Sequence, residues 1–246
     1  MNSPPLISKP RLGRFALQRL MEQFAQLREQ FPVWRRTAEE EQVNALTHGL
    51  GFVIALAGSL VMMSGVLALG NTRLIVGCAL YLTSLTAVYA ASTLSHSATS
   101  FRWKLLFRQF DQAFSYLLIV GTYTPYALAY LHGWQWNLLL AAMWTVALAG
   151  FVAKVFFKHQ VHAVPVKSYV VLGWMPIVAL PALWHAAPPG AFDAIIAGGV
   201  FYTIGKLFLM HDDRVRHFHA IWHLCVIAGS ACHFLGILVF VVHGGI

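Results

Sequence analysis

Residues 217–243 read HFHAIWHLCVIAGSACHFLGILVFVVH, and this apolar stretch contains no Asp, Glu, Lys or Arg. Roughly 20 apolar residues are enough for a helix to cross the hydrocarbon core of a bilayer. Further apolar runs follow one another from about Ala45, with short polar breaks between them. The chain is 58% hydrophobic and 11% charged, whereas a soluble domain carries about 25% charged residues. The sequence therefore predicts an all-α membrane protein that crosses the bilayer several times.

The predicted architecture is a bundle of seven transmembrane helices. The expected spans are residues 45–69, 73–95, 111–131, 135–156, 168–186, 191–210 and 217–243. Glycine, proline or charged residues mark the breaks between them, as in the basic stretch 101–108. We expect no cleavable signal peptide, because the first long apolar run begins only after residue 44.

The positions of lysine and arginine predict how the chain is oriented. Of the 17 Lys and Arg residues, all except Arg73 lie before Ala45, or in or near alternate connections between spans. The positive-inside rule then places the N-terminus and these connections in the cytoplasm and the C-terminus outside. Because the basic residues lie beside the membrane, the net charge of +8 indicates attraction to anionic lipids rather than to nucleic acid. Membrane lipids are therefore the expected partners.

The chain is predicted to divide into a basic cytoplasmic tail, residues 1–40, and a membrane domain, residues 41–246. Within the tail, residues 11–31 repeat apolar side chains at helical spacing, with Arg, Gln and Glu on the opposite face. This pattern predicts an amphipathic helix that lies on the inner leaflet. A loosely ordered basic tail is the alternative.

Three histidines lie at the same predicted depth, near the cytoplasmic ends of their spans. His219 and His223 open the last span at i, i+4 spacing, so on a helix they project from one face and could bind one metal ion. His96 ends the second span, one turn after Ser92. Ionisable groups are costly in a bilayer, so a cluster of them predicts a functional site. The alternative for His96 is an interfacial side chain.

Asp111 stands at the predicted start of the third span. Together with the three histidines it gives three imidazoles and one carboxylate, a set that suits an open zinc site. The alternative for Asp111 is an ion pair with Arg108, or a favourable interaction with the helix dipole.

Glu41, Asn44 and His48 share one helical face at the cytoplasmic start of the first span. We predict that they hold the metal ligands or a neighbouring helix in place. Helix capping and solvation are the alternative for Glu41 and Asn44.

Taken together, four motifs resemble the bacterial hemolysin III branch of the progestin and adipoQ receptor superfamily. They are E-x-x-N-x-x-x-H at 41–48, S-x-x-x-H at 92–96, Asp111 followed by GTYTP at 121–125, and H-x-x-x-H at 219–223. The resemblance covers roughly residues 39–243. It implies a seven-helix bundle in the bacterial inner (plasma) membrane. One departure is Ser95, where many relatives are expected to have tyrosine, and this concerns the shape of the pocket rather than metal binding.

The resemblance also implies roles for individual residues. His96, His219 and His223 would bind zinc near the cytoplasmic face, Asp111 would hold a water molecule on the metal, and Ser92 would match the serine one turn before the first ligand. Relatives are associated with hydrolysis of lipid amides such as ceramide, with hormone sensing and with membrane homeostasis. A fatty acid or lipid amide is therefore an expected ligand.

Three functions remain open at this point. The first is a zinc-dependent lipid amide hydrolase, in which Asp111 accepts a proton and Ser92 hydrogen-bonds the oxyanion. The second is a sensor or receptor of membrane state in which zinc is structural. The third is a cytolytic pore, which the concentration of polar groups at one end of the spans disfavours. The substrate and the oligomeric state cannot be inferred from the sequence.

Overall fold

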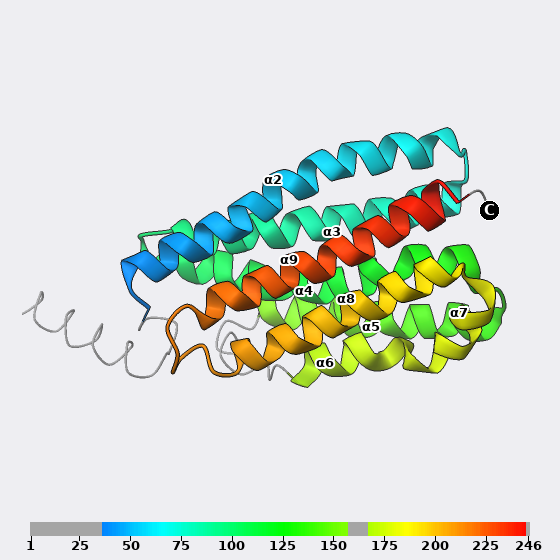
Figure 1. Ribbon diagram of the computed structural model, residues 1–246. Helices are drawn as coiled ribbons and strands as arrows, with labels where there is room; N and C mark the ends of the chain where they lie inside the picture. The colour runs from blue at the N-terminus through cyan, green and yellow to red at the C-terminus, as the bar shows by residue number, and fades with distance from the viewer. Residues whose placement is uncertain (1–35, 157–166, 245–246) are drawn as a thin grey trace, which may run out of the picture. The chain divides into compact units, whose positions relative to one another are not determined.

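The computed structural model describes residues 36–156 and 167–244, which form an all-helical bundle (Figure 1). The amphipathic helix expected at residues 11–31 lies outside the described residues and stays a prediction. In chain order the α-helices are α2 (Ala38–Ala68), α3 (Thr72–Ser97), α4 (Phe101–Tyr130), α5 (Trp134–Phe156), α6 (Lys167–Trp174), α7 (Leu180–Ala186), α8 (Pro189–Leu209) and α9 (Phe218–Gly236). A 3₁₀ segment, Met175–Ala179, joins α6 to α7, and a π-helical segment, Ile237–Val242, continues α9.

These elements make seven helical passes, as predicted. Within the described ranges, six passes are long and apolar enough to cross a membrane: α2, α3, α5, the α6–α7 pass, α8, and α9 with its extension. The remaining pass is α4, which is more polar and packs against α3 and α5. Every residue from Val120 to Ala127 on α4 is buried. Helix α4 tolerates its polar side chains because neighbouring helices, rather than lipid, surround much of it.

Two helices begin earlier than the hydropathy pattern predicted. Helix α4 starts at Phe101, so the basic stretch 101–108 forms its first turns instead of a loop, and Asp111 lies well inside the helix. Helix α2 starts at Ala38, with Glu39, Glu40 and Glu41 in its first turn, where carboxylates stabilise the positive end of the helix dipole. Bilayer thickness sets only the minimum length of a membrane-spanning helix, and these two helices are longer than that minimum.

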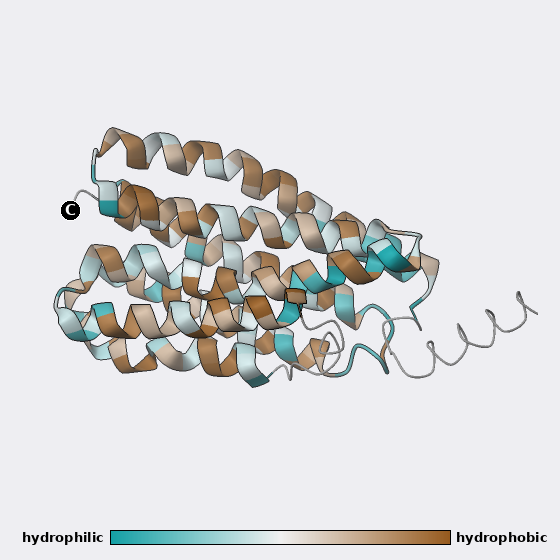
Figure 2. Ribbon diagram, turned by 180° about the vertical axis from the view of Figure 1, so that it is seen from behind, coloured by the Kyte–Doolittle hydropathy of each residue, from teal (hydrophilic) through white to brown (hydrophobic). Residues whose placement is uncertain are grey.

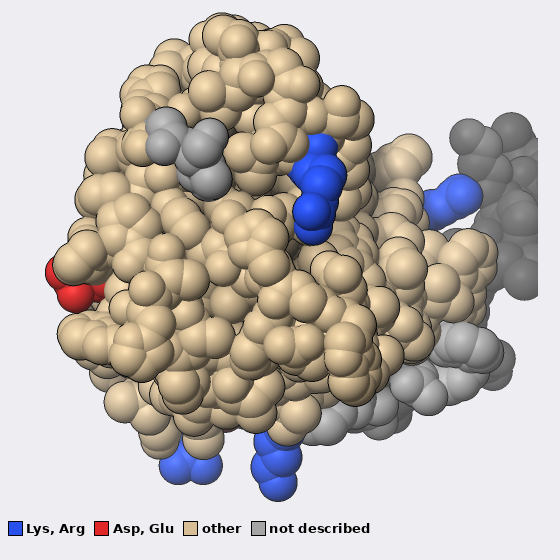
Figure 3. Space-filling model, turned by 90° about the vertical axis from the view of Figure 1, so that its right-hand side faces the viewer, with Lys and Arg blue, Asp and Glu red and all other residues tan. Residues whose placement is uncertain are grey.

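Hydrophilic residues gather at the end of the bundle where α2 and α9 begin (Figure 2). We call this the site end. Most of the surface at the opposite end is uncharged (Figure 3). There the chain turns from α2 into α3 through Gly70, whose φ of +65° suits glycine, and the Asn71 side chain caps α3 by accepting from the backbone N–H groups of Arg73 and Leu74.

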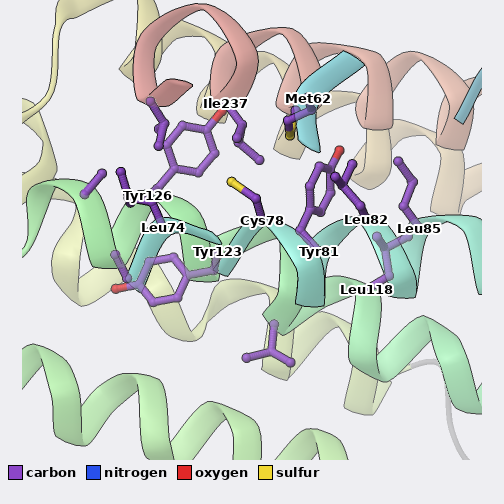
Figure 4. Close-up of a cluster of buried hydrophobic side chains, with 14 of the residues drawn as sticks. Met62, Leu74, Cys78, Tyr81, Leu82, Leu85, Leu118, Tyr123, Tyr126 and Ile237 are labelled. Atoms are coloured by element: carbon purple, nitrogen blue, oxygen red, sulfur yellow. The ribbon is translucent and has the colours of Figure 1, made fainter. Parts of the chain in front are cut away.

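The middle of the bundle is a packed hydrophobic core (Figure 4). Met62, Cys78, Tyr81 and Ile237, from α2, α3 and the π-helical segment that continues α9, have no exposed surface. Many large apolar side chains instead point outward, as expected where helices face lipid: Leu60 of α2 is 71% exposed and Leu138 of α5 is 61% exposed. The described residues therefore form a multi-pass membrane bundle.

Candidate metal centre

Helices α3 and α9 bring three buried histidines together at the site end. His96 comes from the last turn of α3, and His219 and His223 come from the first turns of α9. One ring nitrogen from each lies within 4.8 Å of the other two. His219 and His223 therefore share one face of α9, as their i, i+4 spacing predicted, and His96 of α3 lies opposite them. This arrangement could hold a metal ion.

The turn before α9 sets where its histidines lie. His217 adopts a left-handed conformation, with φ of 63°, which is uncommon for a residue other than glycine. Its backbone carbonyl then accepts the N–H of Ile221 at 3.1 Å as the helix begins. Its own N–H donates to Glu40 Oε1 at 3.3 Å. The start of α9 is thus tied to the start of α2.

Two of the three histidines donate a hydrogen bond to a carboxylate. Nδ1 of His96 lies 2.7 Å from Glu41 Oε2, and Nδ1 of His219 lies 2.6 Å from Asp212 Oδ2. A carboxylate accepts at these distances, so the proton sits on Nδ1. The lone pair of each ring is then on Nε2, where a metal can bind it, and the carboxylate makes the ring a stronger ligand.

The third histidine is held by a hydroxyl group. Thr47 Oγ1 lies 3.1 Å from Nδ1 of His223. The same hydroxyl is within donating distance of two backbone carbonyls, those of Val43 at 3.0 Å and Asn44 at 2.9 Å. Because its one proton is used there, the Thr47 oxygen accepts from Nδ1 of His223. All three imidazoles are therefore in the tautomer that leaves Nε2 for a metal.

Glu41 joins three helices at the site. Besides accepting from His96 on α3, its carboxylate pairs with Nζ of Lys104 on α4, with Oε1 at 2.9 Å. Two neighbouring acids on α2 reach the turn before α9: Glu39 pairs with Arg216, and Glu40 accepts from His217. The acidic first turn of α2 therefore positions both helices that carry the histidines.

His48 contacts the site through its ring face rather than its nitrogens. It stacks on His223, with ring centroids 3.4 Å apart and planes 16° apart, and meets the edge of Tyr89 at 5.1 Å. Neither ring nitrogen of His48 has a hydrogen-bond partner among the described residues. Asn44 is 1% exposed, and its carbonyl is one of the two that Thr47 reaches. Both residues thus support the orientation of His223.

Ser92 and Asp111 meet beside the histidines. The Asp111 carboxyl group lies near the Ser92 side chain and the Arg108 guanidinium, and Ser92 Oγ has no hydrogen-bond partner among the described residues. Ser92 is 1% exposed and lies one helical turn before His96 on α3. Asp111 is not part of the group whose ligand atoms lie within 4.8 Å. From this position the Asp111 carboxyl group could act on a molecule bound to the metal without binding the metal itself.

Three residues at this site were not predicted: Thr47, Lys104 and Asp212. Thr47 adjoins His48 in the sequence, but nothing in a hydropathy pattern marks a threonine as the acceptor for a histidine on α9. Asp212 lies in the charged stretch 211–216, and only the turn that leads into α9 brings it back onto His219. These three residues can be recognised only from side-chain contacts between separate segments, and the periodicity of a sequence does not reveal such contacts.

The fold and the site together define the class of protein. It is a multi-pass helical membrane protein with three buried histidines at one end. The haemolysin-III related family matches residues 36–234, and the chain belongs to that family. The chain is 34% identical over 203 residues to Hemolysin-3 of Bacillus cereus, covering 82% of this chain and 92% of the relative. It is 34% identical over 206 residues to the Hemolysin-3 homolog of Bacillus subtilis (strain 168), covering 84% and 96%.

A more distant relative is human. The chain is 24% identical over 209 residues to the monocyte to macrophage differentiation factor of Homo sapiens, covering 83% of this chain and 85% of that protein. The family predicted from the four motifs is thereby confirmed.

Proposed function

We propose that the protein is a zinc-dependent membrane hydrolase that cleaves a lipid amide. The observation that carries this proposal is the set of Nδ1 acceptors, Glu41, Thr47 and Asp212, because it leaves Nε2 of all three buried histidines for one metal ion. Three neutral imidazoles suit zinc, and three protein ligands leave a fourth coordination position. The donor set therefore fits the metal that the sequence suggested.

Bound zinc would supply a Lewis acid that polarises a carbonyl and lowers the pKa of water to about 7. The chain's own residues supply the proton transfers. The Asp111 carboxylate would accept a proton as the water oxygen joins the amide carbon, and would return it to the amine nitrogen as the C–N bond breaks. Ser92, which lies against Asp111, would hydrogen-bond the developing oxyanion.

The place of the site in the bundle favours a lipid substrate. The histidines are buried among helices, with 8% exposure for His219 and 1% for His223, at the end predicted to face the cytoplasm. A lipid of the inner leaflet can reach such a site from within the membrane. We propose the bacterial plasma membrane as the location, in keeping with the two Bacillus relatives.

The test separates metal binding from turnover. Purified protein is expected to contain one zinc ion per chain by elemental analysis, and His219→Ala is expected to lose it. Asp111→Asn should keep the zinc and lose at least about 100-fold in kcat on a lipid amide, because general base catalysis contributes about 10²–10⁴-fold. His211→Ala is the control, because His211 is exposed and its ring hydrogen-bonds only the backbone carbonyl of Leu207 among the described residues.

Two results would contradict the proposal. One is purified protein without stoichiometric zinc. The other is an Asp111→Asn variant that cleaves the lipid amide at the wild-type rate.

A structural metal in a sensor of membrane state is the second candidate. It is favoured by the number of helices at the site, because the histidines and their acceptors come from α2, α3, α9 and the turn before α9. A metal would tie these segments together. In that case chelation would lower the melting temperature, and zinc-loaded protein would show no hydrolysis of any lipid amide offered.

A further inference from the structure

His48 of α2 is a buried histidine whose two ring nitrogens both lack a partner. It is 3% exposed, and neither Nδ1 nor Nε2 has a hydrogen-bond partner within the part of the chain that the structure describes. No other histidine in residues 36–156 and 167–244 leaves both nitrogens buried and unpartnered. A neutral imidazole has one donor and one acceptor, and burying such groups unpaired is costly. A hydrogen-bond partner on a bound molecule would remove that cost.

The ring of His48 lies beside two of the three clustered histidines. It is stacked on His223, with ring centroids 3.4 Å apart, and it lies close enough to His96 for a charge on one ring to affect the other. His48 is nevertheless not a member of the group whose ligand atoms all lie within 4.8 Å of one another. Its position therefore suits contact with a molecule held at the metal centre rather than with the metal.

Ser92 of α3 presents another unpartnered polar atom at a similar depth in the bundle. Helices α2 and α3 touch at this depth, because a Cβ built on Gly49 would lie 3.5 Å from Cγ2 of Thr93. His48 and Ser92 directly precede these two residues in the sequence. Ser92 Oγ is buried and has no hydrogen-bond partner among the described residues. An oxygen atom of a bound molecule could therefore accept from both the Ser92 hydroxyl and a His48 N–H.

We propose that His48, together with Ser92, donates a hydrogen bond to the carbonyl oxygen of the bound lipid amide. Negative charge develops on that oxygen as the amide is attacked, and fixed donors in a buried site stabilise it. Stacking on His223 would hold the donor in place. This inference rests on the proposed hydrolase function for the identity of the bound molecule, and it adds a residue that contacts the substrate.

The test measures binding of two zinc-binding probes of equal chain length to full-length, zinc-loaded protein in lipid nanodiscs. Stearoyl hydroxamate carries a carbonyl oxygen that can accept from His48, whereas octadecanethiol has no oxygen. His48→Phe keeps a ring that can stack on His223 but removes both nitrogens. It should weaken binding of the hydroxamate at least about tenfold, the usual loss for a hydrogen bond to a charged group, and leave binding of the thiol nearly unchanged. His48→Leu is the second variant, in case His48→Phe does not fold.

Conservative variants identify the nitrogen that donates. The side-chain amides of His48→Gln and His48→Asn place an N–H near the positions of Nε2 and Nδ1, so one of the two variants should retain most of the hydroxamate affinity. His233→Phe is the matched control, because His233 is also buried and stacked on a tyrosine but lies further along α9. It should leave binding of both probes at the wild-type level. On a lipid amide, His48→Phe should lower kcat about 100-fold with little change in KM, as removal of an oxyanion donor does.

The outcomes separate this inference from the proposed function. Equal weakening of both probes by His48→Phe, or loss of zinc from every His48 variant, would overturn the inference, because His48 would then act only through His223 and the metal. Wild-type binding of the hydroxamate to His48→Phe would overturn it too, as would equal losses in the Phe, Gln and Asn variants. A selective loss that one amide variant restores, without hydrolysis of any lipid amide, would instead refute the hydrolase and retain the contact between His48 and the bound molecule.

Discussion

At the residue scale, one acceptor atom outside the ring determines which nitrogen each of the three clustered histidines offers to a metal. Nδ1 of His219 would otherwise be as good a ligand as Nε2, and the Asp212 carboxylate removes that ambiguity by holding the proton. The same reasoning applies to Glu41 on His96 and to Thr47 on His223. These acceptors should therefore matter for metal affinity almost as much as the ligands do.

Two adjacent carboxylates offer a test of this view. Asp212→Asn should weaken zinc binding about 10–100-fold, the usual effect of removing such an acceptor, as measured by competition with a chelator. Asp213→Asn removes the same charge one residue away, on an exposed side chain, and is expected to leave the affinity within about twofold. Equal losses in the two variants would show that the general negative charge of the turn matters, and not the bond to His219.

At the scale of elements, α8 and α9 pack closely because glycine leaves room for a histidine. The ring of His233 on α9 lies directly over Gly198 on α8, and a Cβ built on Gly198 would be 2.3 Å from Nε2 of His233. The ring also stacks on Tyr202, with centroids 5.7 Å apart. His233 is therefore a packing residue that lies further along α9 than the candidate ligands His219 and His223. Through this contact His233 takes part in packing α9, the helix that carries His219 and His223, against α8.

Neighbouring glycines test the packing of α8 on α9. Gly198→Ala should lower the free energy of unfolding by about 1–3 kcal/mol, the usual cost of overpacking a tight contact. Gly199→Ala should have little effect, because no atom lies within 4 Å of a Cβ at that position. Thermal unfolding of both variants in the same detergent checks the difference. Equal melting temperatures for the two would contradict the proposed role of the Gly198 contact.

At the scale of the whole molecule, polar groups and closely packed apolar side chains occupy different parts of the bundle along its axis. The site end holds the histidines, their carboxylate partners and most of the hydrophilic residues (Figure 2). The middle is filled by large side chains such as Tyr81 and Tyr126 (Figure 4). A pore requires a polar or open path along this axis, and the packed middle favours a site at one end instead.

Reporter fusions test the predicted orientation. Alkaline phosphatase, which is active only outside the cytoplasm, should be active when fused after Ile246 and inactive when inserted in the turn 211–216. The physical reason is that Lys and Arg are retained on the cytoplasmic side, and none follows Arg216. The reverse pattern would place the metal centre on the outer side of the membrane, and the proposed access from the inner leaflet would then be wrong.

The three histidines that the sequence singled out lie together in the structure, whereas the starts of two helices were predicted less well. His96, His219 and His223 were identifiable because intramembrane histidines are rare and i, i+4 spacing is a local property of a helix. Helix α4 was predicted to start ten residues late, because the basic stretch 101–108 has the composition of a loop. Charged side chains are compatible with helix when they lie beyond the hydrocarbon core, and hydropathy alone does not show this.

The sequence by itself determined the membrane class, the number of passes and three candidate metal ligands, since each follows from composition or from spacing along one helix. Only the tertiary structure decided which atoms meet. It placed Thr47 on His223 and Asp212 on His219, and it placed Lys154 of α5 on Gln112 of α4. Such contacts depend on the rotation and depth of each helix against its neighbours, which are set by packing over the whole bundle.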